Sequence, residues 1–168
     1  ELARARYSVR SFSDRPIEDE KLDKIIEAGI AAPTAKNLQP VRIYVMKSPE
    51  AMEKMNTLTR CIFGAPAALL VCYNEEEAWH SPFNEEYMSG EMDASIVLTH
   101  MMLEAWDQGI GSCWVGLFDH KEAARVSGET ARAAKSMEPN WSYDMLVLPR
   151  NAFETHDSEL RFVPPLML

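Results

Sequence analysis

The sequence contains only three cysteines, Cys61, Cys72 and Cys113, and no CxxC pair. A small, odd number of cysteines in apolar surroundings is typical of buried thiols in a reducing compartment, so we expect a cytoplasmic protein. The sequence also lacks any apolar run near the roughly 20 residues that a membrane-spanning helix needs. Charged residues begin at Glu1, where a signal peptide would be apolar, so we expect neither a leader nor a membrane partner.

Basic residues are scarce as well. The 17 lysines and arginines are outnumbered by 26 acidic residues, which gives a formal net charge of -9. Nucleic-acid binding through phosphate neutralisation needs a basic surface, so we expect no nucleic-acid partner. A protein with this net negative charge can still bind an anionic ligand, but only at a place where a few arginines lie close together.

Several catalytic signatures are missing. The sequence has no GxGxxG, GxxxxGK[ST], GxSxG or HExxH motif, and its four histidines show no metal-ligand spacing. Nothing therefore favours a nucleotide triphosphatase, an α/β-hydrolase or a zinc protease. What is present is the ordinary composition of a soluble globular protein, with 46% hydrophobic and 26% charged residues. A length of 168 residues predicts one domain, residues 1–168.

Hydrophobic periodicity predicts helices that alternate with strands. We expect helices over residues 18–31, 48–58, 90–108 and 120–127, and strands over 41–46, 65–73, 112–117 and 143–148. The apolar run at 65–73 is typical of a strand covered on both faces, and the polar stretch 74–89 is expected to be a loop. The helix over 90–108 is apolar nearly all round, which indicates a core or an interface helix. This pattern predicts an α/β or α+β sandwich.

Three segments carry candidate binding groups. In the first, Arg6, Ser8 and Arg10 alternate, so an extended backbone would put two guanidiniums and a hydroxyl on one face as a phosphate clamp. A solvated basic N-terminus is the alternative interpretation of this segment.

In the second segment, residues 32–40, Pro33 and Pro40 flank a hydroxyl group and two side-chain amides. Amides can pair with the donor and acceptor edge of a planar heterocycle, but asparagine and threonine also cap turns of their own backbone. The third segment, residues 109–119, holds three glycines around Trp114. Gly116 would present an unobstructed N–H to a ligand, unless these glycines serve only as helix caps.

Taken together, the segments resemble the FMN-dependent nitroreductase family. The matching stretches are residues 6–12 (RYSVRSF), 32–40 (APTAKNLQP), 65–66 (AP), 93–95 (DAS) and 109–116 (GIGSCWVG). Each motif is weak alone, and their joint order is specific. The resemblance implies an α+β nitroreductase-like sandwich, with a central, mostly antiparallel sheet flanked by helices and a buried central helix. It also implies a homodimer that exchanges arms and binds FMN at its interface.

The resemblance further implies a set of cofactor-binding residues. By motif position, Arg6 and Ser8 look like phosphate and ribityl ligands, with Tyr7 between them, and Arg10 looks like the cation that reaches the ribityl chain and the flavin pyrimidine. The loop contributed by the partner subunit would hold Pro33, Thr34, Ala35, Asn37 and Gln39. Asp93 lies where the long helix meets the flavin, and Trp114, Val115 and Gly116 resemble the segment packed on the flavin ring.

The C-terminal residues depart from the family pattern. Residues 149–168 lack the usual Gly-Tyr-Pro turn, and only Arg161 resembles the basic phosphate ligand of the extension. We therefore expect a divergent tail.

The function implied is transfer of electrons from NADH or NADPH through FMN to a nitroaromatic, a quinone or a related small acceptor. We expect a ping-pong mechanism with no catalytic side chain, since the chemistry takes place at flavin N5. Arg10 would favour the reduced cofactor by placing a cation near N1. A flavin-binding protein with little or no turnover, or another branch activity such as reductive dehalogenation, is the alternative.

Overall fold

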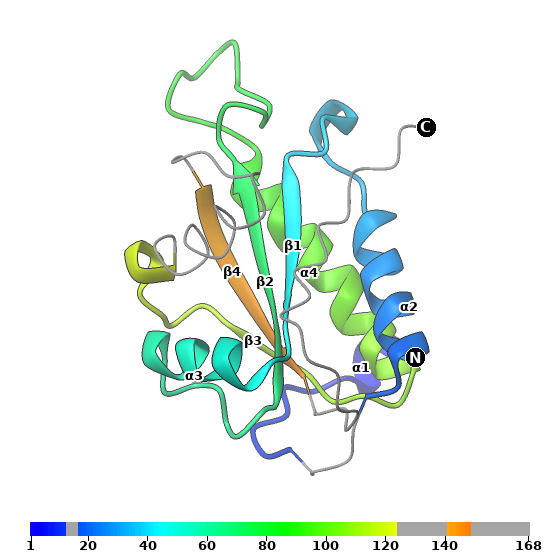
Figure 1. Cartoon of the computed structure of the whole chain (residues 1–168). Coiled ribbons are helices and arrows are strands. Elements are labelled where there is room, and N and C mark those ends of the chain that lie inside the picture. The colour runs from blue at the N-terminus through cyan, green and yellow to red at the C-terminus, as the bar shows by residue number, and fades with distance from the viewer. Residues whose placement is uncertain (13–16, 124–140, 149–168) are drawn as a thin grey trace.

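A four-stranded antiparallel sheet forms the centre of the structure, a computed structural model that describes residues 1–12, 17–123 and 141–148 (Figure 1). The strands lie in the order β1-β2-β4-β3. The elements, in chain order, are α1 (Leu2–Ala5), α2 (Asp19–Ile30), the 3-10 helix η1 (Ala35–Asn37), β1 (Val41–Met46), α3 (Pro49–Leu58), β2 (Ala67–Asn74), α4 (Gly90–Asp107), β3 (Cys113–Val115) and β4 (Trp141–Leu148).

The sheet separates two hydrophobic clusters, because successive side chains of a strand point to opposite faces. Leu69 and Val71 of β2 belong to the cluster beneath α2 and α4, whereas Leu70 belongs to the cluster beneath α3. All three side chains are fully buried. The strand expected to be covered on both faces is therefore confirmed, and β2 pairs with β1 on one side and β4 on the other.

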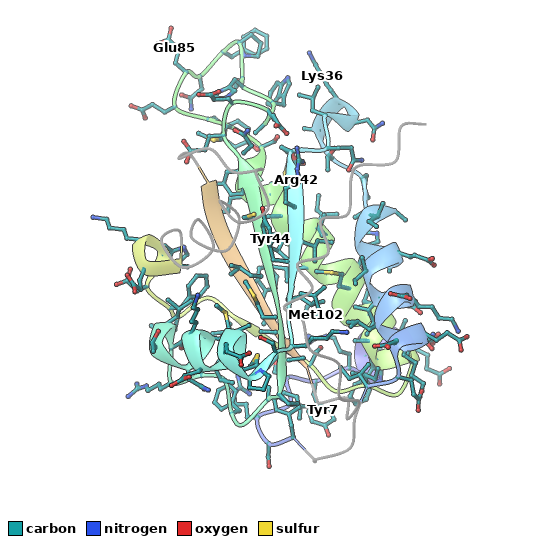
Figure 2. The ribbon with its side chains drawn as sticks, viewed as in Figure 1. Tyr7, Lys36, Arg42, Tyr44, Glu85 and Met102 are labelled. Carbon is teal, nitrogen blue, oxygen red and sulfur yellow. The ribbon has the colours of Figure 1, made fainter. Side chains whose placement is uncertain are left out.

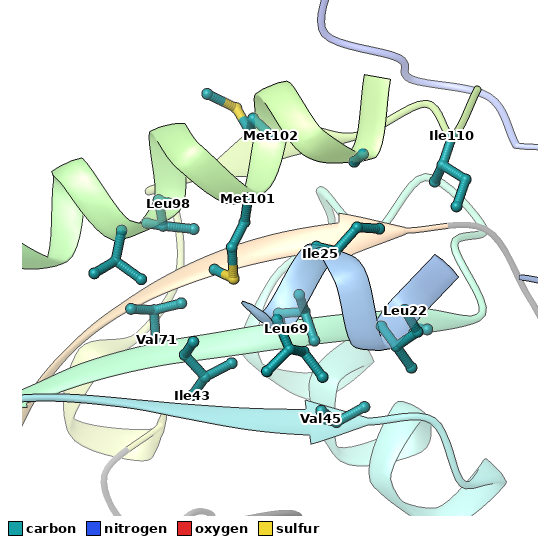
Figure 3. Packing of buried hydrophobic residues seen from close by; sticks show 14 of the residues in the cluster. Leu22, Ile25, Ile43, Val45, Leu69, Val71, Leu98, Met101, Met102 and Ile110 are labelled. Atoms are coloured by element: carbon teal, nitrogen blue, oxygen red, sulfur yellow. The ribbon is translucent and has the colours of Figure 1, made fainter. Parts of the chain in front are cut away.

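Helix α4 packs along α2 and across one face of the sheet. In Figure 3, Leu98 and Met101 of α4 and Ile25 of α2 point toward the strands. These three side chains have no solvent exposure. The opposite side of α4 carries Met92, which is 46% exposed, and the half-buried Ile96. The helix thus has a core face and a second face, with Met92 and Ile96, that the other described residues do not cover fully.

The expected α+β sandwich with a central antiparallel sheet is confirmed, and most elements lie within two residues of their predicted bounds. β3 ends at Val115, two residues earlier than expected, and leaves Gly116 and Leu117 exposed. The helix expected over 120–127 begins at residue 120, where Asp119 Oδ1 accepts hydrogen bonds from the backbone N–H groups of Lys121 and Glu122. Its residues beyond 123 lie outside the described ranges.

The short helix α1 is not predicted by the sequence, because four residues carry too little periodicity. Within the described part of the chain, none of the helices combines the length and the apolar character that crossing a membrane requires.

Candidate functional site

The N-terminal segment is extended beside the start of β3. Ser8 forms an isolated parallel bridge with Ser112, and the Val9 N–H donates to the Ser112 carbonyl oxygen at 2.9 Å. Successive side chains therefore point to opposite sides, and alternate ones share a side. On one side the Tyr7 ring meets the Trp106 ring edge-on, with centroids 5.0 Å apart, and Val9 packs against Gly111.

The other side of this segment carries the three residues of the predicted clamp. Burial raises the pKa of the Cys113 thiol, and the guanidinium of Arg10, a hydrogen bond with the Ser8 side chain and the guanidinium of Arg6 all oppose that rise. The segment's own geometry is fixed by the Ser8–Ser112 bridge and by Arg10, whose Nη1 donates to the Ser8 carbonyl oxygen at 3.3 Å. Two arginines and a serine therefore alternate on a short extended segment of a chain that is strongly acidic overall.

A turn that the sequence did not single out completes this region. The Arg10 guanidinium lies 6.0 Å from the centre of the Phe63 ring, a cation–π distance. Phe63 has a φ of 55°, and its turn is tied to the end of β3 because the Thr59 hydroxyl donates to the Leu117 carbonyl oxygen at 2.6 Å. Only the proximity of these segments in the fold reveals Phe63 as a neighbour of Arg10.

The segment after β3 offers open backbone. Val115 is buried, Trp114 is half-buried and Gly116 is exposed. Within the described part of the chain, a Cβ added at Gly116 would meet no atom within 4 Å, whereas a Cβ at Gly111 would lie 2.7 Å from Cγ2 of Val9. Close packing among these residues therefore requires glycine at position 111 but not at position 116.

The loop between α2 and β1 adopts an unusual backbone conformation. Lys36, Asn37 and Gln39 all lie in the left-handed region, with φ between 51° and 55°. This region costs a non-glycine residue roughly 1–2 kcal/mol. Hydrogen bonds hold the turn closed: the Gln39 N–H donates to Thr34 Oγ1 at 3.0 Å, and Gln39 Nε2 donates to Asn37 Oδ1 at 2.8 Å. Such strain persists only where the surroundings fix it, and it clusters at functional sites.

Asp93 connects this loop to α4. Its side chain is completely buried, Oδ1 accepts a hydrogen bond from the Ala35 N–H at 2.9 Å, and Oδ2 accepts one from the Ser89 hydroxyl at 2.7 Å. The remaining loop residue of the predicted site, Pro33, is exposed.

Within one chain, the predicted site residues form two separate groups. Figure 2 shows Tyr7 at the lower end of the molecule and Lys36 at the upper end. The strand register agrees, because residue 113 aligns through β4 and β2 with Met46, whereas the loop of residues 33–39 precedes Val41 at the other end of β1. At about 3.3 Å per residue, β1 alone separates the groups by roughly 17 Å.

The N-terminal group consists of residues 6–10 with 114–116, and the loop group consists of residues 33–39 with Asp93. Arg161 lies outside the described residues, so the structure does not place it in either group. Among residues 1–12, 17–123 and 141–148, no three histidine, cysteine or acidic side chains are gathered closely enough to hold a metal ion.

Comparisons with known proteins connect this arrangement to a family. The sequence profile described as "Nitroreductase family" matches residues 3–63 and 58–134. A protein of Archaeoglobus fulgidus with the provisional name NADH dehydrogenase/NAD(P)H nitroreductase is 29% identical over 162 residues, which are 95% of this chain and 90% of that protein.

Solved structures share the fold. A nitroreductase family protein from Clostridium difficile 630 superimposes with a TM-score of 0.80 at 31% identity, over 94% of this chain and 87% of that one. A Desulfovibrio desulfuricans protein solved in complex with FMN has a TM-score of 0.68 at 23% identity, over 93% of this chain and 89% of its own. The resemblance seen in the sequence motifs is confirmed: the chain belongs to the nitroreductase family.

Proposed function

We propose that this protein is an FMN-dependent oxidoreductase that passes electrons from NADH or NADPH to a nitroaromatic, a quinone or a related small acceptor. Family membership supports this reaction class. The name of the Archaeoglobus relative supports NAD(P)H as the electron donor, and the complex of the Desulfovibrio protein supports FMN as the cofactor.

The exposed glycine at position 116, on the segment that follows β3, is the observation that carries the proposal. A methyl group there would meet no atom of the described residues within 4 Å, and glycine lets a planar ring approach the backbone closely. Arg6 and Arg10 flank Ser8, which forms a backbone bridge with Ser112, four residues before Gly116. A phosphate-bearing, planar and anionic ligand fits these features, since guanidinium groups bind phosphate oxygens in bidentate fashion. The residues present therefore fit FMN.

The placement of the two groups favours a homodimer in which each FMN site draws on both subunits. A two-fold axis that is perpendicular to α4 and passes through its exposed face would pair the two copies of this helix in opposite directions. The upper end of one chain would then lie beside the lower end of its partner. The loop group of one subunit would then meet the N-terminal group of the other. The exposed face of α4 offers the surface for this contact, with a shallow depression of about 230 Å³ lined by Met92, Ser95, Ile96, Thr99 and His100. We propose an arm-exchanged dimer on this basis.

Each group of residues has a distinct role in this proposal. Arg6 and Ser8 bind the FMN phosphate, and Arg10 approaches the pyrimidine edge with its guanidinium backed by the Phe63 ring. The loop of residues 33–39 contributes backbone and amide groups from the partner subunit. The backbone of residues 114–116 would lie against one face of the ring and leave the other open.

FMN, when bound, supplies the hydride and electron chemistry, and the protein supplies position and charge. The Arg10 guanidinium would supply the positive charge that favours the reduced, anionic form of the bound cofactor. Because only one face is open, the nicotinamide and the acceptor occupy the same space in turn.

Steady-state oxidation of NADH and of NADPH tests the proposal. Protein saturated with FMN should oxidise at least one of the two nucleotides in the presence of a quinone or a nitroaromatic, at a rate proportional to protein concentration. Arg6→Ala at the same low FMN concentration should lose most of that rate and recover it when FMN is raised. Retained flavin without nucleotide oxidation would instead indicate a flavin-binding protein without turnover.

A further inference from the structure

Asp93 is buried at the first turn of α4, yet its hydrogen bonds do not cap that helix. Both side-chain oxygens are engaged elsewhere: Oδ1 by the N–H of Ala35, 58 positions away in the sequence, and Oδ2 by the Ser89 hydroxyl. A buried polar side chain is tolerated when its oxygens are paired, so the fold depends on both partners. One of these partners is the backbone of the strained loop.

Ser89 extends this connection to the acidic stretch before α4. It too is fully buried, and its hydroxyl makes no cap bond to α4 although Ser89 precedes the helix. The hydroxyl oxygen accepts from the Trp79 N–H at 3.2 Å, and the Ser89 N–H donates to the Trp79 carbonyl oxygen at 2.9 Å. Two buried side chains thus link Trp79 through Ser89 and Asp93 to Ala35.

The loop needs such anchors because three of its residues are in the left-handed region. Asp93 holds the loop at its beginning, at Ala35, and the Arg42 guanidinium holds it at its end by donating to the Gln39 carbonyl oxygen at 2.9 Å. A conformation that is unfavourable in isolation persists when the surrounding structure fixes it from both ends. The Asp93 carboxyl group is the more deeply buried of the two anchors, since the Arg42 side chain is 14% exposed.

We propose that Asp93 is a positioning residue for the flavin site: it does not touch FMN but sets the conformation of the 33–39 loop through the Ala35 N–H. This inference rests on the proposed function, because the loop is a binding element only if the protein binds FMN. It assigns Asp93 a different role from direct cofactor contact, and it makes the buried bond to Ala35 a determinant of FMN affinity.

Three variants test the inference: Asp93→Ala, Asp93→Asn and, as a control, Leu22→Ala. Asparagine retains an oxygen that can accept from Ala35, whereas alanine removes it. Leu22 is buried near the start of α2, away from the loop, so its truncation lowers stability without loosening Ala35. Two quantities are measured in each protein: amide hydrogen exchange at Ala35 in the flavin-free full chain, and the dissociation constant for FMN from flavin fluorescence quenching.

We expect Asp93→Ala to speed exchange at Ala35 and to weaken FMN binding by about tenfold or more, the effect of losing one hydrogen bond to a charged group. Asp93→Asn should retain most of the wild-type protection at Ala35 and most of the wild-type FMN affinity. Leu22→Ala should lower the melting temperature but leave the exchange rate at Ala35 and the FMN affinity unchanged. Should Asp93→Ala fail to fold, Ser89→Ala is the milder variant: it removes the donor to Oδ2 and the acceptor of the Trp79 N–H, and the loosened carboxyl group should again give faster exchange at Ala35 together with weaker FMN binding.

Wild-type FMN affinity despite fast exchange at Ala35 would overturn this inference and leave the proposed function standing. An equal loss of affinity in Leu22→Ala would also overturn it, because general destabilisation would then explain the effect. A wild-type protein that binds no FMN would overturn the proposed function and, with it, this inference.

Discussion

Gly116 and Gly111 lie five residues apart on one segment, and the structure predicts opposite consequences for replacing them with alanine. The added methyl group at position 116 meets no atom of residues 1–12, 17–123 or 141–148 within 4 Å, whereas at position 111 it lies 2.7 Å from Val9 Cγ2. Val9 cannot easily yield, because its side chain is β-branched and its N–H is bonded to the Ser112 carbonyl oxygen.

These contacts set the expected magnitudes. Gly111→Ala should lower the free energy of unfolding by about 1–3 kcal/mol, the usual cost of overpacking. That loss corresponds to roughly 2–12 °C in melting temperature for a domain of this size. Gly116→Ala should leave stability unchanged or raise it by about 0.4–1 kcal/mol, because alanine restricts the unfolded chain. In the FMN-bound protein, however, the methyl group would occupy the space proposed for the flavin ring.

Thermal unfolding of the flavin-free variants and FMN titration of both test this reasoning together. We expect Gly116→Ala to keep its melting temperature and to bind FMN roughly five- to hundredfold more weakly, a range that corresponds to about 1–3 kcal/mol of steric conflict. A stable Gly116→Ala protein with wild-type FMN affinity would refute the placement of the ring on this backbone. A Gly111→Ala protein as stable as the wild type would refute the packing argument.

Four further outcomes follow from the site and the fold. Arg6→Ala should bind FMN roughly ten- to hundredfold more weakly, whereas Lys36→Ala should bind it normally, because only Arg6 is proposed to contact the phosphate. Equal flavin retention by the two variants would contradict the role of Arg6 as a phosphate ligand. Analytical ultracentrifugation at micromolar concentration should show a dimer, since obligate interfaces bury roughly 2,000 Å² or more, and a folded, flavin-loaded monomer would argue against the composite site. Burial raises the pKa of the Cys72 and Cys113 thiols above the ordinary value of 9.0, so the unfolded chain loses these protons at a lower pH than the folded chain does. Urea unfolding should therefore show stability falling above about pH 9, with a smaller decline in the Cys72→Ala protein. Steady-state double-reciprocal plots should be parallel, as expected for a ping-pong mechanism on one open face, and intersecting lines would exclude it.

The long periodic elements of the fold were predictable because the spacing of apolar residues indicates which of their faces are buried. The apolar run of β2 and the nearly uniform apolar character of α4 identify the two central elements. Gly109 was expected to cap α4, and its φ of 73° just after the helix confirms this. The start of α3 was predictable from local sequence as well, and there the Ser48 hydroxyl accepts a hydrogen bond from the Ala51 N–H.

Contacts between distant segments were not predictable from local pattern. Asp93 is compatible with the positive end of any helix, and only the folded chain shows that it bonds Ala35. The position of Phe63 under Arg10 depends on how the turn after α3 meets β3. The left-handed backbone of Lys36 and Gln39 contradicts the usual preference of these residue types, and anchors elsewhere in the fold maintain it, whereas Asn37 is of a type that adopts this region more readily.

The visible absorption spectrum of the purified protein, recorded after incubation with FMN and removal of unbound cofactor by gel filtration, tests the central claim most directly. The proposal predicts flavin absorption bands at a stoichiometry of one FMN per chain, together with their loss in the Arg6→Ala protein after the same treatment. A folded wild-type protein that emerges from the column without flavin bands would contradict the assignment of this site to FMN.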